Sequence, residues 1–296
     1  MKSGIINVYK EAGFTSFDVV AKLRGILKIR KIGHTGTLDP DATGVLPICI
    51  GKATKICDLL TDRDKTYRAV MRLGIVTDTL DMSGNVLETN EVIVTEENVK
   101  SAIMSFVGDI MQIPPMYSAL KVNGQKLVDL ARKGQVVERK PRPVTIYDIS
   151  VEDITLPLVT FTISCSKGTY IRTLCDDIGR KLGCGACMES LERIKAAGFS
   201  VENALTLSDI ERIRDEGDLD SIILAIDEAL VEYPKVVAAE ECTKILQNGG
   251  KVSAGDLTLT DLDAEMVRMY MADDTFVGIY ERVGNVYKPN KMFLEA

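Results

Sequence analysis

The residues best suited to chemistry lie in one glycine-rich stretch, residues 33–47, which reads GHTGTLDPDATGVLP. Its three glycines and two prolines argue against a helix and against a regular strand ladder. Asp39 is the most suggestive side chain, because Pro40 biases it toward an extended backbone and the glycines let a ligand approach closely. A carboxylate held on a constrained turn can act as a nucleophile or as a general base.

Tyr67 is a second candidate, and it lies in a predicted strand. Residues 65–73 alternate in polarity, which places Tyr67, Ala69 and Met71 on one face of that strand. Tyr67 is therefore either an aromatic residue of the core or a phenol that lines a cavity. The pattern leaves both alternatives open.

Arg172 is the third candidate. Residues 158–165 form the best strand pattern of the chain, and a helix is predicted from residue 171. Arg172 then lies in the first helical turn, where the helix dipole disfavours a cation. It needs a carboxylate partner, either in a site or in a surface salt bridge. Asp176 and Asp177 are adjacent and do not face each other, so we expect both to be solvated.

These candidates need elements to position them. A strand over residues 4–9 precedes Thr15 and Asp18, which resemble the capping box of an amphipathic helix. The other predicted elements are helices over 95–107, 207–231 (broken at Gly217) and 239–247, and a strand over 275–280, with a boundary at Tyr233-Pro234.

Two other motifs suggest sites that their spacing does not support. Gly51 and Lys52 invite a phosphate-loop interpretation, but the preceding glycine is too distant and Ala53 stands where a hydroxyl should bind magnesium. The seven cysteines are an odd number, and Cys184 and Cys187 form a lone Cys-x-x-Cys. We therefore expect reduced thiols and no metal site.

Composition is that of a soluble globular protein. Hydrophobic residues make up 46% of the 296 positions and charged residues 27%. No segment reaches the roughly 18 apolar residues of a membrane span, and the first ten residues lack the apolar core of a signal peptide. We expect a cytoplasmic protein without a membrane segment.

The net charge of −7 is unevenly distributed, with −11 in residues 200–296 and +4 in residues 1–199. Cations gather over residues 22–31 and again over 121–142. Each cluster is either a solvated face or part of a surface for a polyanion. Because the two clusters flank the glycine-rich stretch, a polyanionic partner is a serious alternative.

Residues 33–47 resemble the catalytic motif of the TruB family of tRNA pseudouridine synthases. Further similar segments follow in the family's order, at residues 65–67, 112–121, 131–132 and 166–172, and more weakly after residue 230. The chain departs from the family pattern at Glu11, Phe17, Val128 and Glu192, where Pro, His, Tyr and Arg are usual.

The resemblance implies an α+β pseudouridine synthase fold, with a mixed central sheet, flanking helices and an inserted RNA-binding arm. Residues 1–230 would form the catalytic domain, with the arm at about 115–143 gripping the T stem and loop. Residues 233–296 would form a small β-rich domain similar to a PUA domain.

The resemblance also implies the reaction, which is isomerisation of the T-loop uridine at position 55 of tRNA after base flipping. Asp39 would be the nucleophile, Tyr67 would stack on the uracil with a base role at C5 as an additional function, and Arg172 would pair with Asp39. Such a pair lowers a carboxylate pKa by about 1–3 units. The expected RNA contacts are His34, Thr35, Lys121, Arg132, Lys167 and Tyr170.

The implied partner is the tRNA T-arm alone. The protein would be a monomer without an obligate protein partner, a metal or an organic cofactor. Two alternatives remain, a non-catalytic protein that binds or folds tRNA, and a synthase that acts on another RNA.

Salt dependence tests the assignment of the two basic clusters. If their cations contact phosphates, the affinity for tRNA should fall steeply with salt, by about 0.7–0.9 logarithmic units per contact for each tenfold increase in salt. Fluorescence titration at several salt concentrations measures this slope. A flat dependence would mean that the clusters are solvated faces.

Overall fold

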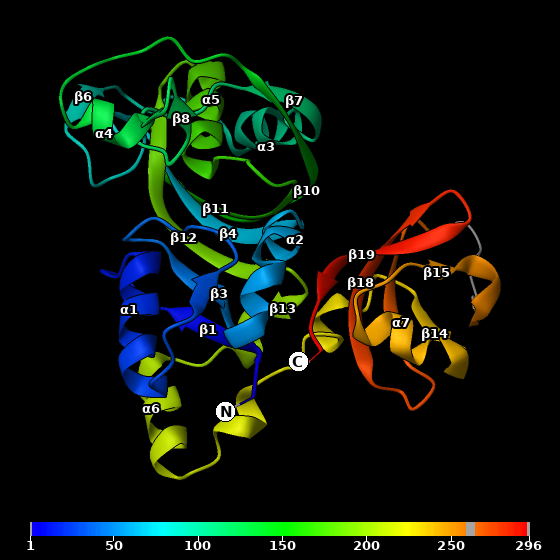
Figure 1. Cartoon of the computed structure of the whole chain (residues 1–296). Helices are drawn as coiled ribbons and strands as arrows, with labels where there is room; N and C mark the ends of the chain where they lie inside the picture. Colours follow the sequence, from blue (N-terminus) through cyan, green and yellow to red (C-terminus); the bar gives the residue numbers. More distant parts are fainter. Residues whose placement is uncertain (1, 259–263, 295–296) are drawn as a thin grey trace.

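The computed structural model describes residues 2–258 and 264–294, which form a larger and a smaller unit side by side (Figure 1). The larger unit is built on a nine-stranded mixed sheet of the described residues, in the order β1-β3-β12-β4-β11-β10-β7, with β2 beside β3 and β13 beside β12. Its strands are β1 Gly4–Lys10, β2 Ile32–His34, β3 Thr43–Ile50, β4 Lys65–Leu73, β7 Gly108–Gln112, β10 Arg142–Thr155, β11 Leu158–Cys165, β12 Ala186–Ala196 and β13 Phe199–Ser200.

Most neighbouring strands are antiparallel, but β12 runs parallel to β3. β12 therefore lies between β3 and β4. β3 follows the glycine-rich loop in the chain, and β4 carries Tyr67. Gly44 and Tyr67 are both register partners of Arg193 on β12. The sheet therefore joins the glycine-rich loop to residues about 150 positions later in the chain.

Two pairs of helices pack on the large sheet in separate regions (Figure 1). The pair α3 (Glu96–Met104) and α5 (Ile171–Leu182) covers β4, β10, β11 and β12 through residues such as Ile103, Phe161 and Leu174. The pair α1 (Ser16–Leu27) and α6 (Leu207–Asp215) covers β1, β2 and β3. The glycine-rich loop starts just after α1 and crosses from one region to the other.

The N-terminus of α1 has the predicted capping box. Asp18 N donates to Thr15 Oγ1 at 3.1 Å, and Thr15 N donates to the Asp18 carboxylate at 2.8 Å. The first helical residue, Ser16, is buried and accepts from Leu38 N at 2.9 Å. The cap thus fixes the helix end that holds the residue before Asp39.

The arm occupies residues 113–141 between β7 and β10 and lies at the upper left in Figure 1. It contains the β8–β9 hairpin (Lys121–Val122 and Gln125–Lys126) and α4 (Leu127–Ala131). Leu127 and Leu130 are buried, so the arm has its own apolar anchors. A second segment outside the large sheet is the hairpin β5–β6 (Ile75–Thr77 and Val86–Thr89), and its connecting loop lines a cavity together with the arm.

The smaller unit has a six-stranded sheet among its described residues, in the order β15-β19-β18-β17-β14-β16. Apolar residues from both units share one buried cluster, in which Phe293 packs with Ile56 and Leu230. Lys291 Nζ also contacts Asp58 Oδ2 at 2.7 Å across this interface. The elements of this unit are β14 Lys235–Ala238, α7 Thr243–Gln247, β15 Val252–Ser253, β16 Leu257–Thr258, β17 Met266–Tyr270, β18 Phe276–Val283 and β19 Val286–Met292.

Several sequence expectations need correction. Residues 207–231 contain one α-helix, α6, followed by 3₁₀ turns at Leu219–Ile222 and Glu228–Leu230. The helix expected over 239–247 is shortened to α7, after a 3₁₀ turn. Asp176 is 4% exposed and pairs with Arg180 at 2.9 Å, so it is not solvated. Short segments satisfy their ends with tighter turns when tertiary packing leaves no room for another helical turn.

The glycine-rich stretch was expected to contain no regular strand, but its first residues belong to β2 and its last residues to β3. Pro47 lies inside β3, where its carbonyl accepts from Thr35 N at 3.2 Å. A proline removes only the donor of its position, and the acceptor still serves the ladder. No helix within the described residues combines the length and apolarity that a membrane crossing requires.

Gly44 marks the point where the loop meets the sheet. Its φ is +102°, and a Cβ there would stand 2.3 Å from Arg193 O. Gly44→Ala should therefore destabilise the protein by about 2–5 kcal/mol, by combining backbone strain with a clash. Denaturant unfolding measures the loss.

Gly25→Ala is the matched control. Gly25 lies within α1 with nothing within 4 Å of its Cβ position, so alanine should stabilise by about 0.5–1 kcal/mol. Equal effects of the two substitutions would contradict the close approach of Gly44 to β12.

Candidate active site

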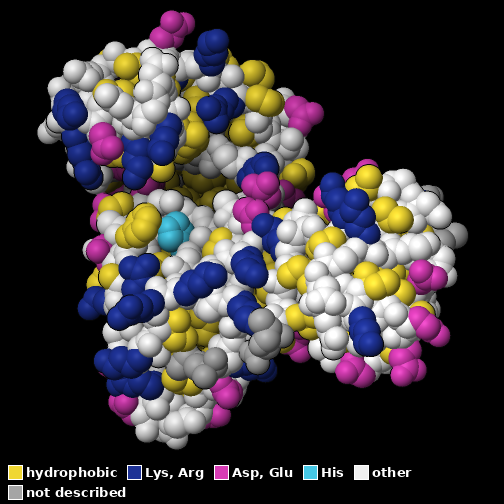
Figure 2. All heavy atoms as spheres, in the orientation of Figure 1, with side chains coloured by type: hydrophobic (Ala, Val, Ile, Leu, Met, Phe, Trp, Pro, Cys, Tyr) yellow, Lys and Arg dark blue, Asp and Glu magenta, His cyan; other side chains and the backbone are white. Residues whose placement is uncertain are grey.

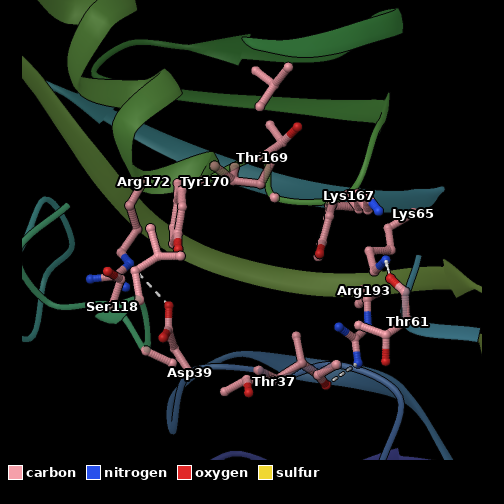
Figure 3. A pocket seen from close by; sticks show the side chains of 18 of the residues that line it. Thr37, Asp39, Thr61, Lys65, Ser118, Lys167, Thr169, Tyr170, Arg172 and Arg193 are labelled. Atoms are coloured by element: carbon pink, nitrogen blue, oxygen red, sulfur yellow. Dashed lines mark hydrogen bonds and ion pairs between the residues drawn. The ribbon is translucent and has the colours of Figure 1, made fainter. Parts of the chain in front are cut away.

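Asp39 and Arg172 lie between two adjacent cavities of about 650 and 620 Å³, and both residues line both cavities. The larger cavity lies between the glycine-rich loop, β4, β12, the arm and the start of α5 (Figure 3). The smaller one lies between residues 78–85, the arm and β12. The recess between the upper and lower parts of the large unit is visible above the histidine in Figure 2.

The predicted carboxylate partner of Arg172 is Asp39. Arg172 Nε contacts Asp39 Oδ2 at 3.0 Å. The arginine side chain is 6% exposed, whereas the aspartate side chain keeps 40% of its surface accessible at the cavity wall. The ion pair is therefore part of a site and not an exposed surface bridge.

Arg172 is held by more than Asp39. Its Nη1 donates to Thr79 O at 3.0 Å and approaches Asp81 Oδ2 at 3.5 Å, and its Nη2 donates to Tyr117 O at 2.8 Å. Asp81 is itself fixed by Ser83 and Thr79, whose hydroxyls each donate to its Oδ1 at 2.6 Å. The planar guanidinium is thus oriented by three chain segments, which fixes the direction of its contact with Asp39.

The pKa of the Asp39 carboxyl is raised above its ordinary value, chiefly because burial disfavours the charged form. Arg172 acts in the opposite direction, and Asp81 adds to the rise. The expected partner and the expected direction of its effect on the pKa of Asp39 are thus both observed, whereas the rise from burial becomes visible only in the folded structure. Desolvation at the cavity wall outweighs the single ion pair.

Tyr67 is both a core residue and part of the cavity wall, so its two alternatives do not exclude each other. It is 8% exposed, packs in the cluster below α5 and lines the larger cavity. Burial raises the pKa of its phenol, and the Arg193 side chain hydrogen-bonds to it. Arg193 is its register partner on β12, which explains why the two side chains meet.

Lys10 anchors the glycine-rich loop through hydrogen bonds to main-chain carbonyls. This lysine is fully buried, and its Nζ donates to Phe14 O at 2.6 Å, Pro40 O at 2.8 Å and Glu11 O at 3.0 Å. Three carbonyl acceptors match the three donors of an ammonium group. Burial lowers the pKa of Lys10 to about 8. The side chain therefore fixes the carbonyl of Pro40, directly after Asp39.

The start of α5 is fixed by the side chain of Gln112. Its Nε2 donates to Tyr170 O at 3.0 Å, and its Oε1 accepts from Tyr170 N at 2.7 Å. Tyr170 has no capping side chain of its own, although it is the N-cap of α5. Gln112 thus positions Tyr170 and, two residues later, Arg172.

Three residues of the expected RNA-binding set lie on a cavity wall. Tyr170 and Lys167 line the larger cavity, and Arg132 lines the smaller one. Lys167 Nζ contacts Asp62 Oδ2 at 2.7 Å. Figure 3 shows Tyr170 close to Arg172, with Lys167 toward the opposite end.

The other three lie outside both cavities. Lys121 is exposed on the β8–β9 hairpin, and His34 is half-buried with its ring edge-on to Phe17 at 5.4 Å. Burial lowers the pKa of His34. Thr35 is 1% exposed and donates to Pro47 O at 3.3 Å, so a direct contact of Thr35 with RNA does not agree with its burial.

The four departures from the family pattern leave the ion pair of Asp39 in place. Phe17 is 70% exposed beside His34, and Val128 lines the smaller cavity. Glu192 accepts from Tyr9 Oη at 3.0 Å, and Glu11 offers only its carbonyl to Lys10. The four departures therefore change residues around the Asp39–Arg172 pair and leave the pair itself unchanged.

Sequence reasoning assigned no role to Lys10, Asp81, Gln112 or Arg193. A lone lysine within an apolar strand was the available signal for Lys10, and Gln112 and Arg193 lie in segments that resemble the family. Asp81 gave only a turn signal. In the described residues, no group of three or more His, Cys, Asp or Glu side chains is arranged to hold a metal ion.

Comparison with solved structures gives the same fold. The crystal structure of a Cbf5-Nop10-Gar1 complex matches with a TM-score of 0.77 at 27% identity, over 98% of this chain and 85% of the other. An H/ACA RNP bound to a substrate RNA containing 2'-deoxyuridine matches with a TM-score of 0.76 at 25% identity, over 99% and 85%. The α+β fold with a mixed sheet is thus confirmed.

Comparison of sequences gives the family. Residues 24–171 match the TruB family pseudouridylate synthase (N terminal domain), and residues 172–231 match the tRNA pseudouridylate synthase B C-terminal domain. A tRNA pseudouridine synthase B from Lachnoclostridium phytofermentans is 52% identical over 99% of this chain and all of its own, and one from Clostridium novyi is 47% identical over the same shares. The chain therefore belongs to the TruB family of pseudouridylate synthases.

Proposed function

We propose that this protein isomerises the T-loop uridine at position 55 of tRNA to pseudouridine, with Asp39 as the nucleophile. Family membership gives the reaction class, and the name shared by the relatives supports tRNA as the RNA. The observation that carries the role of Asp39 is its 3.0 Å contact with Arg172 between two cavities.

The reaction breaks the N1–C1′ bond of uridine and forms a C5–C1′ bond. C5 loses a proton and N1 gains one, so no oxidant or second substrate is needed. Asp39 forms a transient bond to the substrate, either at C6 of uracil or at the ribose. Both routes need an ionised carboxylate with a free oxygen, and the ion pair engages Oδ2 and leaves Oδ1 for the attack.

Tyr67 stacks on the uracil or accepts the C5 proton in this proposal. Its place in the larger cavity supports the stacking role. The raised pKa of its phenol keeps it protonated at neutral pH, so a base role would require deprotonation in the complex. The stacking role is therefore the simpler of the two.

The RNA lies across the basic face in this proposal. Dark blue side chains gather below the histidine, which itself lies below the recess, in Figure 2. His34 fills space left by the flipped base, and Lys121, Arg132, Lys167 and Tyr170 contact the T-arm. Extrusion of the base costs a few kcal/mol, roughly, which stacking and ionic contacts offset.

The domains divide the work in the same way. Residues 1–230 carry out catalysis, the arm at about 115–143 grips the T-arm, and residues 233–296 form a PUA-like accessory domain. The boundary is supported by the end of the family match at residue 231 and the start of the smaller sheet at Lys235. The protein acts in the cytoplasm as a monomer without a protein partner.

Asp39→Asn tests the nucleophile. The substitution removes the attacking charge with little change of shape, so pseudouridine formation in a T-arm stem-loop should fall by about 10⁴-fold or more. Single-turnover assays measure the rate. Asp41→Asn, in the same loop and exposed, is the control and should retain most activity. Full activity of the Asp39 variant would refute the assignment.

The alternative substrates are separated by mapping. Pseudouridine is mapped across total RNA with and without the protein, and loss confined to position 55 of tRNA is expected. Loss elsewhere would indicate a synthase for another RNA. The arm's cations favour RNA folding as a second function, and an Asp39→Asn protein that restores tRNA folding in cells would support it.

Arg172→Met tests the electrostatics of Asp39. Arg172 lowers the pKa of Asp39 against the rise from burial, so its removal should raise that pKa further. Activity requires the ionised form and is lost as pH falls through the pKa, so the acid limb of the pH–rate profile should move to higher pH.

Arg172→Lys is the matched control, because it keeps the charge but loses the planar fork. Its acid limb should stay near that of the wild type, while kcat falls by about 100-fold or more through misplacement of Asp39. An unchanged acid limb in Arg172→Met would contradict the electrostatic role.

A further inference from the structure

The larger cavity has a cationic end that the proposed chemistry does not use. Asp39 and Arg172 lie at one end, and Lys65, Lys167 and Arg193 lie at the other (Figure 3). Lys167 already has a carboxylate partner, Asp62, at 2.7 Å. Lys65 and Arg193 differ from it in burial and in partners.

Lys65 is 8% exposed, and its partners among the described residues are two carbonyls. Its Nζ donates to Thr61 O at 2.8 Å and to Arg63 O at 2.5 Å. An ammonium group has three donors, so one is left. Burial and the charge of Arg193 lower the pKa of Lys65 to about 8, while Asp62 and Asp64 oppose the shift.

Arg193 is 1% exposed and is likewise held by neutral groups. Its Nε donates to Val45 O at 2.7 Å, its Nη2 donates to Gly36 O at 3.2 Å, and Tyr67 is its other partner. Within the described residues, neither Arg193 nor Lys65 has a carboxylate within ion-pair distance. Two buried cations side by side without an anion are unusual.

Gly36 leaves space above both cations. A Cβ at Gly36 would lie 3.6 Å from Arg193 Nη1 and 3.8 Å from Lys65 Cε. The two side chains therefore converge on one point of the loop, three residues before Asp39. The absence of a side chain there keeps this end of the cavity open.

We propose that Lys65 and Arg193 form an anion subsite that binds one phosphodiester group of the RNA beside the target uridine. This inference rests on the proposed function for the identity of the RNA. A phosphate brings the full negative charge that the two cations lack, whereas a uracil carbonyl brings only a dipole. The subsite sets the position of the flipped nucleotide along the cavity, with Asp39 and Arg172 at the other end.

Neutralising single phosphates tests the subsite. T-arm stem-loops carry a neutral methylphosphonate at either linkage of the target uridine, and binding is measured in the Asp39→Asn background to prevent turnover. At one linkage, the neutral group should weaken binding by about 10- to 100-fold. Lys65→Met should weaken binding of the unmodified RNA similarly, and the two losses should not add.

Lys100→Met is the matched control, since Lys100 lies on α3 and its ion-pair partner among the described residues is Glu96, at 3.9 Å. The loss of affinity caused by Lys100→Met should be small, and it should add to the loss caused by the methylphosphonate. Additive losses for Lys65→Met would overturn the subsite. So would insensitivity of binding to both methylphosphonates together with a fall in kcat alone for Lys65→Met in the protein that retains Asp39, which would indicate contact with a uracil oxygen.

A measurement on the native lysine covers the case in which Lys65→Met does not fold. Nitrogen-15 NMR follows the Lys65 amine during titration with inorganic phosphate at constant ionic strength. A bound anion favours the ammonium form, so the pKa of Lys65 should rise from about 8. An unchanged pKa at saturating stem-loop and at high phosphate would refute the proposal.

Pseudouridine formation by the wild-type protein is assayed in parallel. Absence of pseudouridine would overturn the proposed function, whereas the phosphate titration would still report on the subsite. If pseudouridine forms normally but the losses of affinity from Lys65→Met and from the methylphosphonate are additive, the subsite proposal is refuted and the proposed function stands.

Discussion

The candidate site depends on one ion pair at the wall shared by two cavities. Asp39 loses part of its hydration at the cavity wall, which raises its pKa, and Arg172 is the strongest of the charges that oppose this rise. An arginine serves this purpose only if its direction is fixed. Thr79 O, Tyr117 O and Asp81 fix it, and they belong to segments that also line the cavities. The geometry of the carboxylate is therefore determined by the surrounding chain as much as by its own loop.

Each segment that meets at this pair has its own anchor. Lys10 and Ser16 hold the residues on either side of Asp39, and Gln112 holds the start of α5. These anchors are buried polar groups with satisfied hydrogen bonds, which gives a single arrangement because any other would leave a charge or donor unpaired. Arg172 also links the arm to Asp39 through Tyr117 O. A shift of the arm would therefore move Arg172 and change its contact with Asp39.

Charge is organised locally in this protein, and the net value is a poor guide. A chain with a net charge of −7 has a basic face below the histidine in Figure 2, and its larger cavity holds two buried cations without a carboxylate at ion-pair distance among the described residues. The acidic excess lies mainly after residue 200, and residues 216–232, between α6 and the smaller unit, carry six acidic side chains and no basic one. Attraction of a polyanion acts over about a Debye length, so the local pattern decides where RNA is attracted.

The sequence by itself determined the elements with strong periodicity and the family-specific motif. It located β4, β11, the capping box of α1 and the start of α5, and it selected Asp39, Tyr67 and Arg172. Only the tertiary structure decided the net pKa shift of Asp39, the burial of Thr35 and Asp176, and the support by Lys10, Asp81, Gln112 and Arg193. These properties depend on the parallel pairing of β3 with β12 and on desolvation, which arise from contacts between residues far apart in the chain and leave no local pattern.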